Sequence, residues 1–145
     1  MIKILCIGKI KEKYLCDLID DYKGRINKYH KLEVIELKDS NIDEEKDLLL
    51  KNINKDDYVI CMDICGDSFD SIGFKNKLEN LFNNSYKNIV FVVGGSYGIH
   101  NDVKRICNER MSFSSMTFPH GLFRGLLLEQ IYRSFKIMNN ESYHK

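Results

Sequence analysis

The residues best suited to chemistry lie in the last third of the chain, and they begin with a glycine turn. Gly94, Gly95 and Gly98 follow an almost wholly apolar run at 88–93. Glycine lets a backbone approach a ligand closely, and a helix that follows such a turn offers free N–H groups. The turn therefore predicts a ligand-binding loop, although a tight strand-to-helix turn without a ligand explains the glycines equally well.

A dinucleotide-binding fingerprint is the first specific interpretation of such a turn, and it fails. The fingerprint needs Gly-x-Gly-x-x-Gly after the first strand. Here the first strand ends in the lone Gly8, and the later turn reads Gly-Gly-Ser-Tyr-Gly. Because both spacing and position differ, the glycines argue against a Rossmann dehydrogenase.

Groups that could bind anions or accept protons follow the turn. His120 and Arg124 are four residues apart at the start of a predicted helix, so they share one face. Arg133 comes four residues after Glu129, which is the spacing of an ordinary helical ion pair. The chain closes on residues 143–145, Tyr-His-Lys, which taken alone is typical of a frayed terminus.

Strand-like and helix-like segments alternate along the chain. Strand patterns occur at 2–7, 32–37, 58–64 and 88–93. Helical spacing is expected at about 14–29, 43–53, 71–82 and 101–109, with a short strand at 111–114 and Pro119 in the first turn of a long final helix. This order predicts an α/β fold with a parallel-rich sheet flanked by helices on both faces.

Length and composition limit the class of protein. The chain has 145 residues, of which 43% are hydrophobic and 30% charged, so we expect one globular domain over 1–145. No apolar run reaches the roughly 18 residues of a membrane span, and the first strand shows no secretory cleavage site. We therefore expect a cytoplasmic protein without a membrane role.

The five cysteines are odd in number and scattered, which favours reduced thiols. Cys61 and Cys65 have a spacing that suits two metal ligands on a helix, but they lie in a strand pattern. No metal site is expected.

Charge is unevenly distributed although the net charge is only +1. Residues 1–38 carry +3, residues 39–99 carry −5 and residues 100–145 carry +3. The two basic ends could hold a polyanion, although a solvated surface is the commoner explanation. Lys9, Lys11 and Lys13 beyond the first strand could bind phosphate or simply face solvent at a helix start.

The order of motifs in the C-terminal third carries a specific resemblance. Residues 112–120 read Ser-Phe-Ser-Ser-Met-Thr-Phe-Pro-His, followed by Arg124, by Glu129-Gln130-Ile131-Tyr132-Arg133 and by the terminal Tyr143-His144-Lys145. Together with the opening strand and the glycine turn, this pattern resembles the RlmH family. Its members are SPOUT-class methyltransferases that modify a pseudouridine of large-subunit ribosomal RNA. The resemblance covers nearly the whole chain.

The resemblance implies a C-terminal trefoil knot in which three loops hold S-adenosylmethionine. Mapped onto this sequence, the first loop follows Met62 and the second begins at Gly94. The third loop comprises Phe113, Ser114, Ser115, Met116, Thr117 and Phe118. Without the family match, its alternating serines and aromatic residues would indicate an edge strand.

The resemblance also assigns roles to the residues that follow. Arg133, Tyr143 and His144 occupy family positions implicated in activity, and an imidazole, which titrates near pH ~6.5, suits proton transfer. Family members are homodimers whose active sites draw on both subunits. His120, Arg124 and Lys145 join the three N-terminal lysines as candidate RNA contacts.

The expected function is methylation of N3 of a pseudouridine in 23S ribosomal RNA, in the helix 69 region, on the assembled ribosome. One alternative is a knotted methyltransferase that acts on another RNA such as tRNA. The other is a non-catalytic ribosome-docking module with the same fold. The retained cofactor loops argue against the docking module, and the terminal Tyr-His-Lys argues against the tRNA enzyme.

Overall fold

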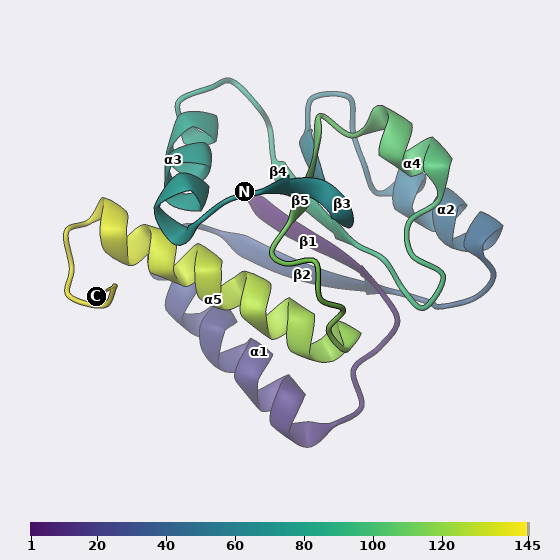
Figure 1. The fold of residues 1–145 in the computed structure, drawn as a ribbon, viewed down its shortest axis with the longest axis horizontal. Coiled ribbons are helices and arrows are strands. Elements are labelled where there is room, and N and C mark those ends of the chain that lie inside the picture. The colour runs from purple at the N-terminus through teal and green to yellow at the C-terminus, as the bar shows by residue number, and fades with distance from the viewer. Residues whose placement is uncertain (145) are drawn as a thin grey trace.

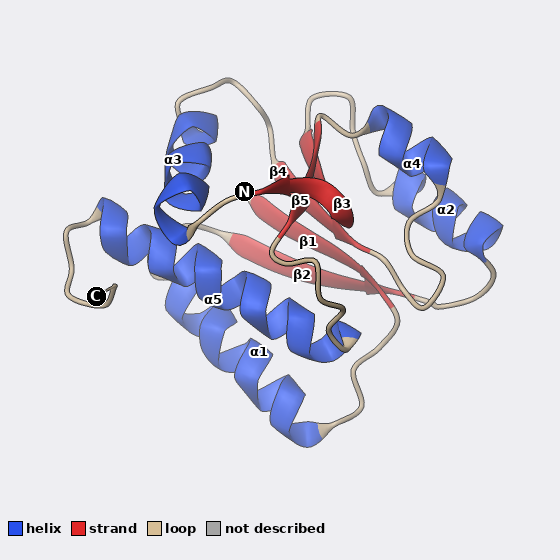
Figure 2. Cartoon of the chain, in the orientation of Figure 1, coloured by secondary structure: helices blue, strands red, loops and turns tan. Residues whose placement is uncertain are grey.

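The computed structural model describes residues 1–144, which form a five-stranded parallel sheet between two layers of helices (Figures 1 and 2). The strand order is β2-β1-β4-β3-β5, so β1, β4 and β3 lie in the interior of the sheet. The strands are β1 (Ile2–Ile7), β2 (Leu32–Leu37), β3 (Tyr58–Ser68), β4 (Ile89–Val93) and β5 (Glu109–Ser112).

The helices divide between the two faces of the sheet (Figure 2). One face is covered by α1 (Lys13–Ile26), α3 (Ser71–Phe82) and α5 (His120–Met138), and the other by α2 (Ile42–Lys51) and α4 (Asn101–Ile106). Phe91 and Leu127 belong to the larger apolar core, under α5, whereas Val92 and Leu49 belong to the smaller one, under α2. The predicted α/β fold with helices on both faces is therefore confirmed.

Local sequence explains where the helices start. Asn41 caps α2 by accepting the backbone N–H of Glu44 at 2.9 Å, and Asp70 caps α3 by accepting that of Gly73 at 2.7 Å. Pro119 stands just before α5 rather than in its first turn, because its fixed φ is combined here with an extended ψ of 139°. All five residues of β4 are buried, as expected for a strand covered on both faces.

The third strand departs from its predicted end at residue 64. It continues to Ser68, and Met62 and Asp67 both align with Met111 of β5, so the residues between them bulge out of the ladder. Gly66 is one of these bulged residues, and a Cβ on it would lie 2.5 Å from the backbone of Arg110 and Met111. The two backbones therefore meet at a point where only glycine fits.

The expectation that every cysteine is reduced is wrong for one pair. Cys61 of β3 and Cys107, which follows α4, are joined by an S–S bond of 1.99 Å. Cys6, Cys16 and Cys65 are free, and burial raises the pKa of the Cys6 thiol to about 12. Within residues 1–144, no helix combines the length and apolar character that a membrane crossing requires.

Candidate functional site

A cavity of about 270 Å³ opens at the carboxyl ends of β3, β4 and β5, the edge where open parallel sheets bind ligands. Three chain segments form most of its wall: the bulged part of β3, the glycine turn after β4 and the loop after β5. Lys104 of α4 and the first turn of α5 complete it. Of the eight residues predicted to hold a cofactor, all but Ser115 line it, namely Met62, Gly94, Phe113, Ser114, Met116, Thr117 and Phe118.

The glycine turn has a backbone that no larger residue could adopt. A Cβ on Gly94 would lie 2.7 Å from the carbonyl group of Gly98, and Gly98 itself has a φ of +74°. The Gly98 N–H donates to the Gly95 carbonyl at 3.0 Å, which closes the turn. The turn therefore presents bare backbone to the cavity.

The segment after β5 is a loop and not the edge strand that its alternation would indicate. Ser112 Oγ donates to the Ser114 carbonyl at 2.9 Å, and Ser114 Oγ accepts the Met116 N–H at 3.0 Å. The Phe113 ring packs edge-on against Phe74, with 5.8 Å between the ring centroids. The serines thus bend the loop, and Phe113 fixes it to the core.

The cavity wall is mostly apolar and carries one carboxylate, Asp63, and one ammonium group, Lys104. Lys104 Nζ lies 3.2 Å from Asp63 Oδ2, and Arg110 lies 3.7 Å from the same oxygen. Burial alone would raise the pKa of Asp63, but the Cys65 N–H and the two cations lower it overall. Asp63 and Lys104 were absent from the predicted cofactor residues, although Asp63 directly follows Met62.

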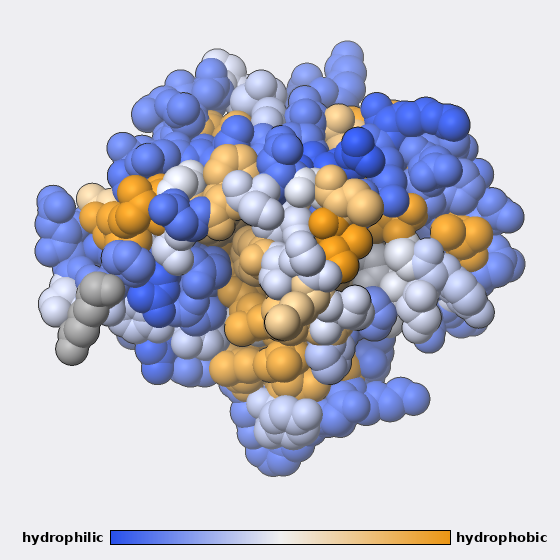
Figure 3. All heavy atoms as spheres, in the orientation of Figure 1, coloured by the Kyte–Doolittle hydropathy of each residue, from blue (hydrophilic) through white to orange (hydrophobic). Residues whose placement is uncertain are grey.

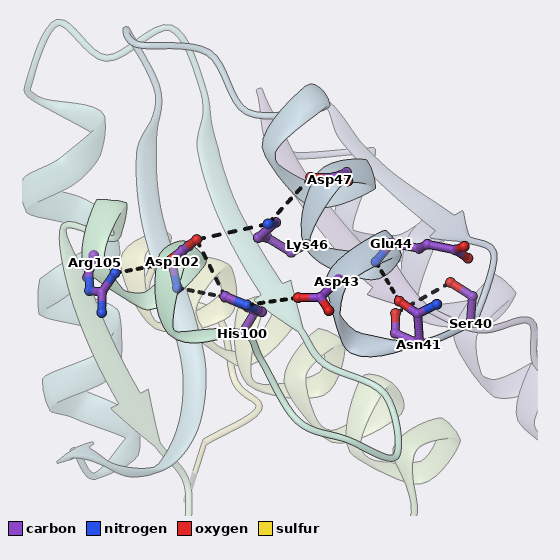
Figure 4. A network of polar contacts seen from close by, with 9 residues as sticks. All are labelled: Ser40, Asn41, Asp43, Glu44, Lys46, Asp47, His100, Asp102 and Arg105. Carbon is purple, nitrogen blue, oxygen red and sulfur yellow. Dashed lines mark hydrogen bonds and ion pairs between the residues drawn. The ribbon is translucent and has the colours of Figure 1, made fainter.

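A polar network holds α4 in place behind the glycine turn (Figure 4). His100 Nδ1 accepts the Asp102 N–H at 2.9 Å and so caps α4, while His100 Nε2 lies 3.3 Å from Asp43 at the start of α2. Asp102 also contacts Arg105 at 2.7 Å and Lys46 at 4.0 Å. These contacts tie α4 to α2, and α4 carries Lys104.

A second polar cluster forms at the far end of α5, and it contains the three predicted catalytic residues. Glu129 Oε1 accepts hydrogen bonds from Arg133 Nη2 at 2.7 Å and from the Tyr143 hydroxyl at 3.1 Å. The Arg133 guanidinium lies over the Tyr143 ring at 4.7 Å and contacts His144 Nδ1 at 3.1 Å. Tyr143 and His144 are therefore docked on α5 rather than frayed, and Glu129 joins the cluster as its hub.

The hydrogen bond between Arg133 and His144 determines which imidazole nitrogen carries the proton. Arginine has only donors, so Nδ1 must accept, and Nε2 then carries the proton of the neutral ring. The hydrogen bond to Glu129 raises the pKa of Arg133. Burial, followed by hydrogen bonds to Tyr22 and Glu129, raises the pKa of Tyr143. Arg133 therefore stays charged and Tyr143 stays protonated at neutral pH.

The two groups of candidate residues are well separated within one chain. His120 lines the cavity at the start of α5, and Arg133 comes thirteen residues later in the same helix. At 1.5 Å per residue the helix places them about 20 Å apart. The segment that follows α5 correspondingly begins at the opposite end of that helix from the cavity loop (Figure 1).

Arg124 is interior, which corrects its assignment as an RNA contact. Its side chain is 3% exposed, and Nη2 donates to the carbonyls of Ile7 at 2.7 Å and Gly8 at 2.9 Å. Nη1 donates to Glu36 at 3.0 Å. Because both terminal nitrogens of its guanidinium are bonded inside the fold, Arg124 joins the start of α5 to the end of β1.

The other candidate RNA contacts divide into three groups. Lys9, Lys11 and Lys13 are exposed, and Lys13 lies 2.6 Å from Asp17 in a helical ion pair. His120 is exposed at the cavity mouth. Lys145 lies outside the described residues.

Apolar surface gathers in the middle of one face, over α5 and the loop before it (Figure 3). Large apolar side chains are exposed in these and adjoining segments: Met116 at 74%, Ile64 at 50% and Leu122 at 38%. Side chains this exposed beside a cavity mark a surface suited to a partner.

The arrangement suits an elongated ligand with an apolar body and a charged end. The apolar wall and the bare glycine backbone would hold the body, and Lys104 and Asp63 lie where charges could be matched. No group of three or more His, Cys, Asp or Glu side chains within residues 1–144 is arranged to hold a metal ion.

Comparisons with known proteins give one consistent result. A family model described as "Predicted SPOUT methyltransferase" matches residues 1–144. The ribosomal RNA large subunit methyltransferase H of Clostridium botulinum strain 657 is 45% identical, and the alignment covers 99% of each chain.

Two solved structures share the fold at 12% sequence identity. A probable methylase family protein from Haemophilus influenzae has a TM-score of 0.59, over 99% of this chain and 70% of that one. The SpoU methyltransferase AviRb from Streptomyces viridochromogenes, in complex with AdoMet, has a TM-score of 0.50, over 92% of this chain and 57% of that one.

Proposed function

Because the chain belongs to the SPOUT methyltransferases and, among them, to the ribosomal RNA large subunit methyltransferase H family, we propose that it methylates N3 of a pseudouridine in 23S ribosomal RNA. The methyl donor is S-adenosylmethionine, and the target lies in the helix 69 region of the assembled ribosome. The chain acts in the cytoplasm as a single SPOUT-type domain over 1–145, and the trefoil knot stays a prediction.

The observation that carries this proposal is the cavity between three loops at the carboxyl edge of the sheet. Its apolar wall suits an adenine ring and a methionine chain, and the glycine turn lets backbone groups reach the ligand edge. S-adenosylmethionine, when bound there, would supply an electrophilic methyl group on a sulfonium sulfur. The residues present therefore fit the donor.

The acceptor needs groups that the second cluster provides. N3 of pseudouridine is an imide nitrogen between two carbonyl groups, so it must lose a proton before it can attack a methyl group. Arg133 is held charged by Glu129, and such a cation beside a carbonyl oxygen stabilises the imide anion. The Tyr143 hydroxyl stays protonated and can donate a hydrogen bond to the same base.

His144 is the proposed proton acceptor, and its geometry sets a condition on that role. The accepting lone pair on Nδ1 is the one that Arg133 occupies. Arg133 must therefore leave Nδ1 for a substrate oxygen when the base enters, and that movement frees Nδ1 for the N3 proton. One exchange of hydrogen bonds would then bring Arg133 to the substrate oxygen and free His144 to accept the proton.

The separation of about 20 Å between cavity and cluster supports a homodimer. Within one chain, Arg133 cannot reach a methyl group held in the chain's own cavity. A second copy that packs on the apolar surface around Met116 and Leu122 would bring its cluster to this cavity. Each active site of the dimer would then combine residues of both chains.

A ribosomal substrate fits the weak charge of the surface. With a net charge of +1, the chain has little excess positive charge to attract bare RNA, although Lys9 and Lys11 are exposed beyond β1. A preformed ribosomal surface supplies shape recognition that does not depend on net charge. We therefore expect assembled ribosomes to be better substrates than naked RNA.

The test supplies S-adenosylmethionine with a labelled methyl group to naked 23S RNA, free subunits, whole ribosomes and tRNA, and then locates the label by nuclease mapping. We expect label on N3 of one 23S pseudouridine, with the highest yield on whole ribosomes. Label on tRNA alone would overturn the proposed substrate, and binding of ribosomes without any transfer would favour the docking module.

A further inference from the structure

The charged part of the cavity wall allows one step beyond the proposed function, on which it rests. We propose that Lys104 binds the α-carboxylate of the donor's amino-acid end, and that Asp63 is a positioning residue that aims Lys104 at it. Lys104 would thereby decide which way round the donor lies in the cavity.

Lys104 is placed and equipped for this role. It projects from α4 into the cavity wall, where it is the one Lys or Arg among the described lining residues. Its side chain is 28% exposed and lines the cavity. An ammonium group has three donors, and within the described residues the carboxylate that Lys104 contacts is that of Asp63, so donors remain for a ligand.

The contact between Lys104 and Asp63 is an attraction between charges without an aligned hydrogen bond. Asp63 Oδ2 lies 3.2 Å from Lys104 Nζ, yet this buried oxygen makes no aligned hydrogen bond. Asp63 Oδ1 accepts the Cys65 N–H at 3.2 Å, which fixes the carboxylate to the bulged part of β3. Asp63 is therefore anchored by one oxygen, while the other holds the lysine by charge.

The charges of the donor explain why a single lysine matters. S-adenosylmethionine carries a sulfonium and an ammonium cation but just one anion, its α-carboxylate. A cation in the wall attracts that carboxylate and repels the sulfonium, so it favours one orientation of the ligand. With the carboxylate at Lys104, the amino-acid end of the donor would lie on the α4 side of the cavity.

The experiment compares four adenosyl ligands by calorimetry on the whole protein. S-adenosylmethionine and S-adenosylhomocysteine carry the carboxylate, decarboxylated S-adenosylmethionine lacks it, and 5′-methylthioadenosine lacks the entire amino-acid end. For Lys104→Met we expect Kd to rise about 10- to 100-fold for the first two ligands, because a hydrogen bond to a charged group is lost. For the last two, Kd should stay within about twofold or fall, since no carboxylate contact exists to lose.

A second variant tests the positioning role of Asp63. Asp63→Asn keeps the shape but removes the charge that holds Lys104, so we expect the same ligand pattern with a loss of about 3- to 10-fold. A merely structural role would weaken all four ligands alike. Lys75→Met is the matched control, because Lys75 makes a similar lysine–carboxylate contact, 3.2 Å from Glu79 on α3.

The outcomes separate the inference from the proposed function. Equal losses for all four ligands in Lys104→Met, or no loss for any, would overturn the carboxylate contact while the methyltransferase proposal stands. Wild-type protein that binds none of the four ligands would overturn the proposed donor, and the inference with it. If Lys104→Met fails to fold by circular dichroism, Lys104→Gln provides the same comparison.

Discussion

The two ends of α5 carry the two halves of the proposed active site, and they are built differently. The cavity end is shaped by backbone: the glycine turn allows no Cβ at Gly94, and the loop after β5 is bent by its serines. The far end is a cluster of side chains around one carboxylate, Glu129, and His144 in that cluster is exposed. One half is enclosed within a single chain, whereas the other lies on the surface.

This difference suggests a division of labour between binding and chemistry. A ligand that every turnover must bind in one orientation benefits from a rigid backbone cradle. Groups that must meet a large RNA, and must exchange hydrogen bonds when it arrives, are better placed on a surface. If both ends of α5 served the same chain, this division between binding and chemistry would not hold.

Arg133→Ala should lower the rate of methyl transfer by about 100- to 1,000-fold, because it removes the cation that would stabilise the imide anion. The Kd for S-adenosylmethionine should change less than about twofold, since the cavity residues would hold the donor and Arg133 would contact the base. Single-turnover kinetics on ribosomes and calorimetry give the two values.

Mixed dimers test whether each active site combines residues of both chains. Arg133→Ala chains reassembled with chains disabled in the cavity should regain about a quarter of wild-type activity, because half of the dimers then contain one intact composite site. Mixtures that stay inactive, although mixed dimers form, would show that each site belongs to one chain.

Gly94→Ala should weaken the binding of S-adenosylmethionine by about 10- to 100-fold, because the new Cβ overpacks the turn. The added atom would lie 2.7 Å from backbone atoms of Gly98. Gly24→Ala in α1 is the control, since its Cβ would meet nothing within 4 Å. Calorimetry with both variants checks the prediction, and equal affinities would contradict a backbone cradle.

Glu129→Gln should lower the rate of transfer by about 10-fold with little change in donor affinity, because hydrogen bonds to a neutral amide are weaker than those to a carboxylate. Arg133 and Tyr143 both donate to this one side chain. Amide hydrogen exchange over 139–144 should become faster. Glu79→Gln on α3 removes a comparable helical ion pair and should alter neither value.

The smallest expected effect is the contribution of Asp63 to the pH dependence of stability. The folded-state pKa of Asp63 is lowered from its ordinary 3.8, so its ionised form contributes stability above that pH. This contribution is lost as pH falls through the lowered pKa. Urea unfolding of wild type and Asp63→Asn should therefore differ at pH 6, and the difference should shrink as pH falls below 3.8 and through the lowered pKa. A difference that stays constant with pH would mean that the charge of Asp63 has no part in stability.

Local pattern was sufficient for much of the fold. The apolar run at 88–93 predicted a buried central strand, and β1, β2 and α3 have their predicted ends. Such elements are set by neighbours in sequence, because periodicity and capping residues act within a few positions. Seven of the eight predicted cofactor residues line the cavity, and they were predicted from the order of motifs in the family. Their contact with the cofactor stays a prediction.

The errors arose where distant parts of the chain meet. Arg124 shares a helix face with the exposed His120, but its Nη1 and Nη2 atoms donate to Glu36 and to the end of β1, 88 or more residues away. The bond between Cys61 and Cys107 spans 46 residues and leaves no local signature. The sequence did not predict Lys104 for the same reason, because only the fold brings α4 beside Asp63.

The interior position of Arg124 has a consequence for how this protein can vary. Its guanidinium binds the carbonyls at the end of β1, so these contacts fix the rotation of α5 about its own axis. An inserted or deleted residue between Arg124 and Arg133 would turn the cluster by about 100° and shift it by about 1.5 Å. Loops on the surface can change length without such an effect, whereas the number of residues in α5 between Arg124 and Arg133 must stay constant.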